Sequence, residues 1–60
     1  MKKNSRVRIK NESSEFFGMT GTIITEDKQK WKSVKFDTPK LIWGETHNGH
    51  FFNESELELI

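Results

Sequence analysis

Two tryptophans and seven basic side chains are the residues of this sequence whose chemistry best suits binding. Trp31 and Trp43 carry indole rings on which an unpaired nucleobase can stack. Guanidinium and ammonium groups hydrogen-bond phosphate oxygens. The predicted binding residues are therefore both tryptophans together with Arg6, Arg8, Lys10, Lys28, Lys30, Lys32 and Lys35. A solvated charged face is the alternative interpretation of the basic set.

A pair of histidines around the dipeptide Asn48-Gly49 is the nearest approach to a metal site. His47 and His50 can share an ion, but Glu45 is the one further ligand nearby, and zinc sites normally use three or four ligands. The chain contains no cysteine, which excludes thiolate ligands and disulfides. We therefore expect no metal and no cofactor, and we interpret both histidines as turn residues.

The sequence offers no residue set for catalysis. No serine, histidine and acid occur at a spacing suited to nucleophilic attack, and 60 residues leave little room for a buried pocket that shifts pKa values. Three glutamates near the end face solvent in the simplest interpretation, or dock a basic partner; they are Glu54, Glu56 and Glu58. We therefore expect a protein that is not an enzyme.

Length and composition predict one small folded domain. A chain of 60 residues buries about 60 % of the surface that its unfolded form exposes, so its core is small. Hydrophobic residues make up 32 % of the chain and are clustered, which favours folding despite a mean hydropathy of -0.80. We expect residues 1–60 to form the domain, with residues 1–4 as a flexible tail.

Charge and hydropathy also suggest a location. The net charge is only +1, but basic residues gather near the start and the middle and acidic residues near the end. No apolar stretch follows the basic start, and no run approaches the roughly 20 apolar residues that span a bilayer. We expect a soluble cytoplasmic protein without membrane contact, and the Lys-, Asn- and Ile-rich composition suggests an AT-rich bacterial or phage genome.

The first part of the chain predicts a strand and an anchored loop. Between residues 6 and 10, Val7 and Ile9 alternate with basic residues, which is the pattern of a half-buried strand. A long polar loop follows, and the apolar pair Phe16 and Phe17 is expected to anchor it.

Two glycines three positions apart stand at the start of a β-branched run. Glycine enters left-handed backbone without a Cβ penalty. We interpret Gly18 as the bend that ends the loop and Gly21 as a place where two strands crowd together, with the second strand over residues 21–26. A phosphate-binding loop would need more glycine and a following helix.

The middle of the chain predicts two further strands. A charged turn over residues 26–30 leads into a third strand over residues 31–36, in which Val34 and Phe36 face inward with Lys32, opposite Trp31. Asp and Pro in residues 37–40 predict a turn. We then expect a fourth strand over residues 41–45, bent at Gly44, and a hairpin turn at Asn48-Gly49.

The end of the chain completes an all-β fold. Asn53 can cap one helical turn over residues 54–56, and a closing strand follows over residues 57–60. Five short strands with one helical turn before the last predict a small five-stranded barrel, which removes exposed strand edges. The expected core is Val7, Ile9, Ile23, Val34, Phe36 and Leu57.

This order of elements resembles the SH3-like barrels, in which a long first loop precedes a meander and a short helical turn precedes the last strand. Within that group, Gly18-x-x-Gly21-x-Ile23 after the Val7-x-Ile9 strand is similar to the KOW-type motif of ribosomal and transcription-associated proteins. The resemblance implies binding to nucleic acid or a ribonucleoprotein. The chain has no tyrosine, which argues against the proline-peptide binding of signalling SH3 domains.

Two functions remain open at this point. One is a non-catalytic module that binds RNA, DNA or a ribonucleoprotein through the basic strand and hairpin and an exposed tryptophan. The other is a protein-binding module, a regulator, inhibitor or assembly subunit, that uses the same aromatic surface or adds a strand at an open sheet edge. The sequence leaves open the partner, the oligomeric state and whether Trp31 and Trp43 are exposed or cover the core.

Overall fold

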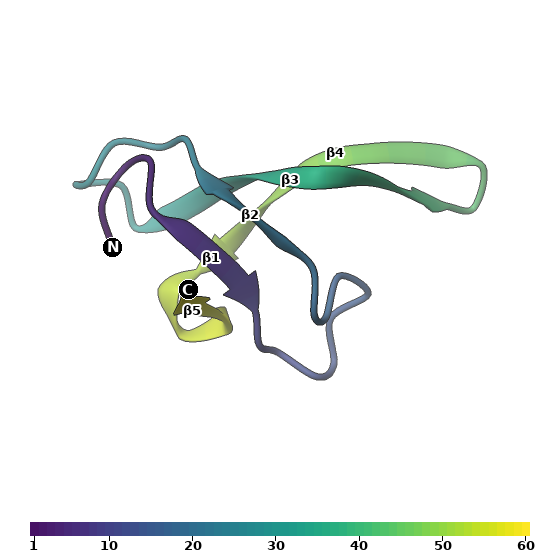
Figure 1. Ribbon diagram of the computed structural model, residues 1–60, viewed down its shortest axis with the longest axis horizontal. Coiled ribbons are helices and arrows are strands. Elements are labelled where there is room, and N and C mark those ends of the chain that lie inside the picture. Colours follow the sequence, from purple (N-terminus) through teal and green to yellow (C-terminus); the bar gives the residue numbers. More distant parts are fainter.

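The computed structural model describes residues 1–60 and shows five antiparallel strands in a single sheet (Figure 1). A 3-10 turn precedes the last strand. The elements are β1 (Arg6–Ile9), β2 (Thr20–Ile23), β3 (Trp31–Ile42), β4 (Glu45–Asn53), the 3-10 turn (Glu54–Glu56) and β5 (Leu57–Leu59). The expected all-β class, the five strands and the short helical turn before the last are confirmed.

The sheet is not closed into a barrel. Its strand order is β4-β3-β2-β1-β5, and no pairing joins β4 to β5. The 3-10 turn separates these two strands by only three residues and carries the chain across to β1, where β5 pairs through Val7 and Leu59. Both β4 and β5 are therefore edge strands.

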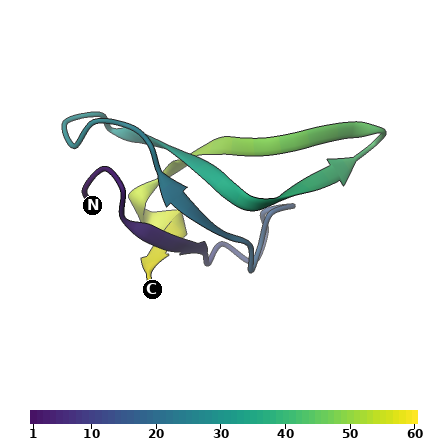
Figure 2. The ribbon, with the colours of Figure 1, turned by 45° about the horizontal axis from the view of Figure 1, so that its top comes forward.

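The hairpin of β3 and β4 extends beyond the rest of the molecule (Figure 2). We call its distal part, residues 40–47, the arm. The molecule measures 33 × 19 × 18 Å, and the arm accounts for the long dimension. Beyond Phe36 the sheet narrows, because β2 pairs only with the first half of β3, up to Phe36.

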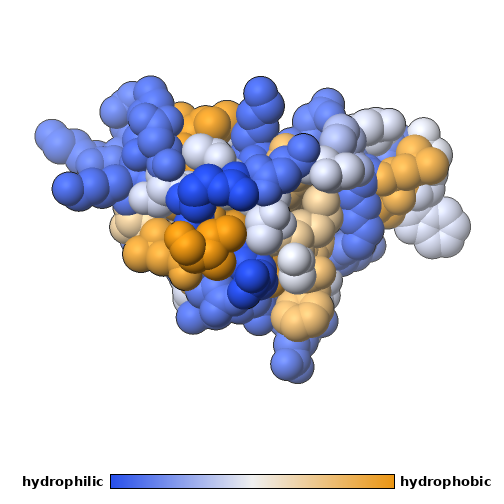
Figure 3. Space-filling view, in the orientation of Figure 1, coloured by the Kyte–Doolittle hydropathy of each residue, from blue (hydrophilic) through white to orange (hydrophobic).

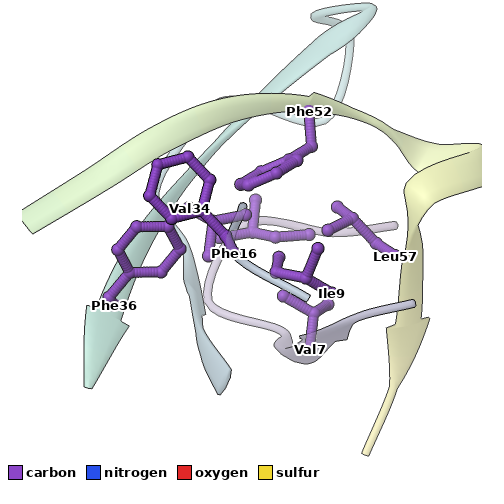
Figure 4. Packing of buried hydrophobic residues seen from close by; sticks show 8 residues of the cluster. Val7, Ile9, Phe16, Val34, Phe36, Phe52 and Leu57 are labelled. Carbon is purple, nitrogen blue, oxygen red and sulfur yellow. The ribbon is translucent and has the colours of Figure 1, made fainter. Parts of the chain in front are cut away.

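The core lies on the concave side of the bent sheet (Figure 4). Successive side chains of a strand point to opposite faces of the sheet, so every second residue points into the core. All six predicted core residues are buried, and Phe16 and Phe52 complete the cluster. The cluster is Val7, Ile9, Phe16, Ile23, Val34, Phe36, Phe52 and Leu57.

Phe16 fixes the long loop between β1 and β2, as predicted. Its ring packs against Phe36 at a centroid distance of 5.0 Å and against Phe52 at 6.0 Å. Phe17 points away and is exposed. The apolar pair therefore divides into one core residue and one surface residue.

The two glycines act as the sequence predicts. Gly18 has a φ of +83°, which ends the loop in a left-handed turn. Gly21 lies opposite Phe36, and a Cβ added to it would stand 2.4 Å from the Lys35 carbonyl oxygen and 2.8 Å from Val34 Cγ1. Only glycine allows β2 and β3 to approach this closely.

The hairpin turn at Asn48-Gly49 is a wrong prediction, because both residues lie inside β4. The two-residue turn falls instead at Trp43 and Gly44, whose φ values are +52° and +79°. Positive φ at both central residues is what a type I′ hairpin turn requires. The predicted fourth strand over residues 41–45 and the bend at Gly44 are therefore also wrong.

The predicted turn over residues 37–40 is a disruption within a continuous β3. The register with β4 shifts between Lys35 and Lys40. Pro39 has no N–H to donate and so is suited to an irregular position in a strand. Asp37 begins this irregular segment, and its carboxylate pairs with Arg6 of β1.

Asn53 begins the 3-10 turn, as predicted. Its backbone N–H donates to the Glu56 carboxylate over 2.9 Å, and the Asn11 side-chain amide donates to the same carboxylate over 2.9 Å. Glu56 thereby links the end of β4 to the loop after β1.

Residues 1–4, expected to form a tail, make specific contacts. The amino group of Met1 pairs with Glu54, the Lys3 backbone N–H donates to Asp27 over 2.7 Å, and the Asn4 N–H donates to the Ile23 carbonyl over 2.7 Å. The chain contains no helix with the length and apolar character needed to cross a membrane.

Candidate nucleic-acid interface

The convex side of the sheet, which we call the outer face, carries the candidate site. In β3, Lys32 and Val34 point to the core, so Trp31, Ser33 and Lys35 point outward. The register places Ser33 opposite Phe51 and therefore brings Phe51 to the same face. The predicted facing of Trp31 is confirmed.

Three apolar side chains on this face form a patch around Ser33. Trp31 is 52 % exposed, Phe51 60 % and Ile24 49 %. Ile24 belongs to the patch because its N–H donates to the Ser33 carbonyl over 2.9 Å, which sets it beside β3. We call the two rings of Trp31 and Phe51, together with the neighbouring Ile24 side chain, the aromatic patch.

Phe51 was not among the predicted site residues. A signal for it exists in the sequence, because adjacent residues of a strand face opposite sides. Once Phe52 enters the core, Phe51 must face outward. Phe51 and Phe52 are adjacent in one regular strand, so only one of them can be a core residue.

Four of the predicted basic residues are exposed, and their ammonium groups have no ion-pair or hydrogen-bond partner. They are Lys10, Lys28, Lys30 and Lys35. Lys28 and Lys30 belong to the segment that leads directly into Trp31, and Lys35 lies two residues beyond Ser33 on the outer face. Lys28, Lys30 and Lys35 therefore lie near the aromatic patch, whereas Lys10, at the end of β1, lies beside the 3-10 turn.

Both arginines of β1 are engaged within the protein. Arg6 forms two hydrogen bonds with Asp37, of 2.5 and 2.6 Å, and Arg8 pairs with Glu58 over 3.2 Å. Their guanidinium groups lie on the outer face but are partly neutralised. They contribute less free positive charge than the sequence suggested.

Lys32 is not part of the exposed basic surface, which corrects the prediction. Its side chain is 1 % exposed, and Nζ donates to the backbone carbonyl of Asp27 over 2.8 Å. The alternation of β3 places Lys32 on the core side, and its long stem reaches past the core to the end of the preceding turn. Its charge is used within the fold.

Trp43 is exposed but is remote from Trp31. It stands at the tip of the arm and is 95 % exposed, whereas Trp31 stands at the opposite end of β3. Figure 3 shows hydrophobic atoms gathered at this distal end, and a second group over β1 and β5. The two tryptophans are both on the surface, and they do not form one platform.

The two histidines are strand residues and not turn residues. His47 and His50 lie in β4 with their rings 5.7 and 5.1 Å from that of Phe16. They cover the end of the core. The structure contains no group of three or more His, Cys, Asp or Glu side chains arranged to hold a metal ion.

A cavity of about 580 Å³ lies along the free side of β4. Its lining combines aromatic rings with polar groups from the β1–β2 loop and the 3-10 turn. The principal lining residues are Phe16, Trp31, Phe51, Phe52, Asn53 and Glu56. The aromatic patch thus continues around the sheet edge into a recess.

Comparison of the chain with protein-family models, with curated proteins and with solved structures gives no match.

Proposed function

We propose that this protein is a non-catalytic module that binds single-stranded nucleic acid on the outer face of its sheet. The observation that carries the proposal is that Trp31 and Phe51 expose their rings from neighbouring strands. Exposed aromatic rings on a sheet provide stacking surfaces for unpaired bases, each of which contributes about 1–3 kcal/mol. A cytoplasmic location fits this proposal.

The spacing of the two rings suits consecutive bases. Trp31 is opposite Asn53, and Ser33 is opposite Phe51, so the rings are diagonal neighbours across β3 and β4. Diagonal side chains on adjacent strands stand about 7 Å apart. The small Ser33 side chain leaves the ring faces open.

The unpaired lysines supply the electrostatic part of the interface. Lys35 is on the outer face, and Lys28 and Lys30 precede Trp31 directly. Because no carboxylate neutralises them, they are free to pair with phosphates along a bound strand. The net charge of +1 favours weak binding that depends on salt.

Titration of a labelled oligonucleotide at several salt concentrations tests the proposal. Trp31→Ala and Phe51→Ala should each weaken binding by about 5- to 150-fold, which corresponds to the loss of one stacked base. Lys35→Gln should reduce the slope of log affinity against log salt by about 0.7. Phe17→Ala is the matched control, since Phe17 is an exposed aromatic residue on the β1–β2 loop.

Two results would contradict the proposal. One is the absence of any binding at low salt to both single-stranded RNA and single-stranded DNA. The other is binding that Trp31→Ala and Phe17→Ala change equally, because the contact would then be nonspecific.

We also propose that the fold is related to the SH3-like barrels of the KOW type. The strand order, the long first loop and the 3-10 turn before β5 support this relationship. The positive φ of Gly18 and the close approach at Gly21 give the glycines of the motif a structural role. An experimental structure in which β5 and the 3-10 turn pack elsewhere would contradict it.

A protein partner is the second candidate, and the arm favours it. Leu41 and Trp43 are exposed at its tip, and the arm carries one lysine, Lys40, whose ammonium group donates to the Glu15 carbonyl. An apolar tip without free positive charge suits a protein surface better than a phosphate backbone. A protein pull-down that loses its partner on Trp43→Ala and keeps it on Phe17→Ala would support this function.

A further inference from the structure

The outer edge of β4 is long and unprotected. β4 is nine residues long, contains no proline and carries a single charged side chain, Glu45. No other strand pairs with this edge, and the distal part of the β3–β4 hairpin extends away from the rest of the molecule in Figures 1 and 2. The other edge strand, β5, has only three residues, which is a common protection against pairing.

The backbone groups at this edge can be assigned from the hydrogen bonds of the neighbouring strands. The Ser33 carbonyl accepts from Ile24, so the Ser33 backbone faces β2 and the Val34 backbone faces β4. Val34 is opposite His50, and alternation therefore directs the N–H and C=O of Phe51 to the free edge. The Asn53 N–H, which bonds to Glu56, points to the same side.

The backbone groups of the arm that point to the free edge follow from its hairpin turn. In a two-residue hairpin the residues that flank the turn bond to each other, so Ile42 and Glu45 pair. Thr46 is the next residue along β4, and its N–H and C=O point to the free edge. The edge thus offers backbone groups at Thr46 and at Phe51, on either side of Asn48-Gly49.

Because the two edge-facing positions, Thr46 and Phe51, are placed evenly about Asn48-Gly49, we infer that two copies of the chain pair antiparallel through their β4 edges. A two-fold axis beside Asn48-Gly49 brings Thr46 of each copy opposite Phe51 of the other. Side-chain facing agrees, because the register shift between Lys35 and Lys40 breaks the alternation of β4. The rings of His47 and His50 therefore both pack against Phe16 on the inner face, and Thr46 and Phe51 both lie on the outer face. A C2 contact of this kind uses one surface twice and closes as a dimer.

The sequence itself favours this register. Asn48-Gly49 is the strongest short hairpin signal, and a hairpin turning there would pair Thr46 with Phe51 and His47 with His50. Within one chain the turn at Trp43 and Gly44 takes its place. Between two copies, the same residues make the same pairs.

In this dimer the tip of the arm contacts the second copy. Continuing the register brings Trp43 of one copy to the level of Glu54 of the other. The cavity of about 580 Å³ opens at that place, lined by Trp31, Phe51 and Asn53. An indole that is 95 % exposed in the single chain therefore meets an aromatic-lined recess. Each copy supplies one tip and one recess.

The pairing does not depend on the nucleic-acid proposal. It joins two five-stranded sheets edge to edge, so their outer faces become one continuous surface. If the chain does not self-associate, the oligonucleotide titration still tests nucleic-acid binding. If no oligonucleotide binds, the dimer can still form.

Sedimentation equilibrium from micromolar to millimolar concentration tests the dimer directly. The mass should rise from the 7.1 kDa of one chain to twice that value. Trp43→Ala should raise the dissociation constant about 30-fold, as expected for an aromatic anchor that fills a recess of the partner. Thr46→Pro removes an edge N–H without touching a bond to β3, and it should also favour the monomer. Phe17→Ala and Leu59→Lys, the latter on the β5 edge, should leave the equilibrium unchanged.

A mixed-label measurement locates the contact even if a variant folds poorly. The chain has no cysteine, so Asn48→Cys can carry a single nitroxide. In a mixture with an isotope-labelled copy, amide signals of residues 45–52 should broaden in the labelled copy, whereas a nitroxide on Glu12→Cys should not affect them. A chain that stays monomeric throughout, a dimer that broadens elsewhere, or a monomer whose β4 edge binds only unrelated peptides would overturn the inference.

Discussion

Arg6 and Asp37 form a two-pronged ion pair that ties β1 to the irregular segment of β3. Nη1 and Nη2 donate to the two carboxylate oxygens over 2.5 and 2.6 Å, and the Thr20 hydroxyl donates to Asp37 over 2.7 Å. Hydrogen bonds from Arg6, and then from Thr20, lower the pKa of Asp37 from its ordinary value to about 2. The pair holds three strands of the outer face together.

Stability should fall in acid because of this pair. A carboxyl group whose pKa is lowered on folding stabilises the native state while it is ionised. Its contribution is complete above the ordinary pKa of about 4 and is lost as the pH falls towards 2. The unfolding midpoint should therefore decrease over this range, and Asp37→Asn should make it less dependent on pH. Glu12→Gln, at an exposed residue without a contact, should keep the dependence of the wild type.

The packing of Lys32 should matter more than its charge. Its Nζ donates to Asp27, whose carbonyl lies in an exposed turn where water can replace the ammonium group. Lys32→Met keeps the buried stem and should stay within about 1 kcal/mol of the wild type. Lys32→Ala removes the stem and should be about 2 kcal/mol less stable than Lys32→Met in urea unfolding. Equal losses in both variants would show instead that the hydrogen bond dominates.

Alternation along single strands predicted most of the fold. Val7, Ile9 and Val34 were placed in the core because they alternate with polar residues, and burial follows the same rule in the structure. The same rule placed Lys32 on the core side, yet its charge suggested a surface role. The carbonyl group that accepts its hydrogen bond belongs to a turn five residues earlier, which the pattern of one strand does not reveal.

The arm was not predictable from local preference. Asn48-Gly49 is the better turn dipeptide, but a turn there would pair Phe52 with Glu45 in place of Lys32. The observed turn brings Phe52 and Val34 into one core with Phe16. Burial of these side chains therefore outweighs the preference of the turn residues. The site predicted from the sequence lacked Phe51 for the same reason, because the facing of Phe51 follows from this register.

Gly21 is expected to be the glycine least tolerant of a side chain in the sheet. Its missing Cβ would meet a backbone carbonyl, that of Lys35, at 2.4 Å, and a carbonyl in a paired strand has little freedom to move. Gly21→Ala should therefore lower the unfolding free energy by about 1–3 kcal/mol, measured in urea. Ser33→Ala, on the neighbouring strand, serves as the control and should change stability less. An unchanged midpoint for Gly21→Ala would show that β2 and β3 lie further apart.

Trp43 is expected to oppose folding of the single chain. It has a φ of +52° in the first central position of a hairpin turn, where Asn is preferred and a large side chain is unfavourable. Its indole is 95 % exposed and so contributes little packing to compensate. Trp43→Asn should therefore stabilise the dilute monomer by about 1 kcal/mol, measured by thermal unfolding.

The same substitution should weaken self-association, because the indole is the group that enters the recess of the second copy. Stability and association thus change in opposite directions, which a purely structural role of Trp43 does not predict. The comparison is made with Trp43→Phe, which keeps an aromatic ring and should retain part of the association. A Trp43→Asn monomer that unfolds at a lower temperature than the wild type would show that the indole packs within its own chain.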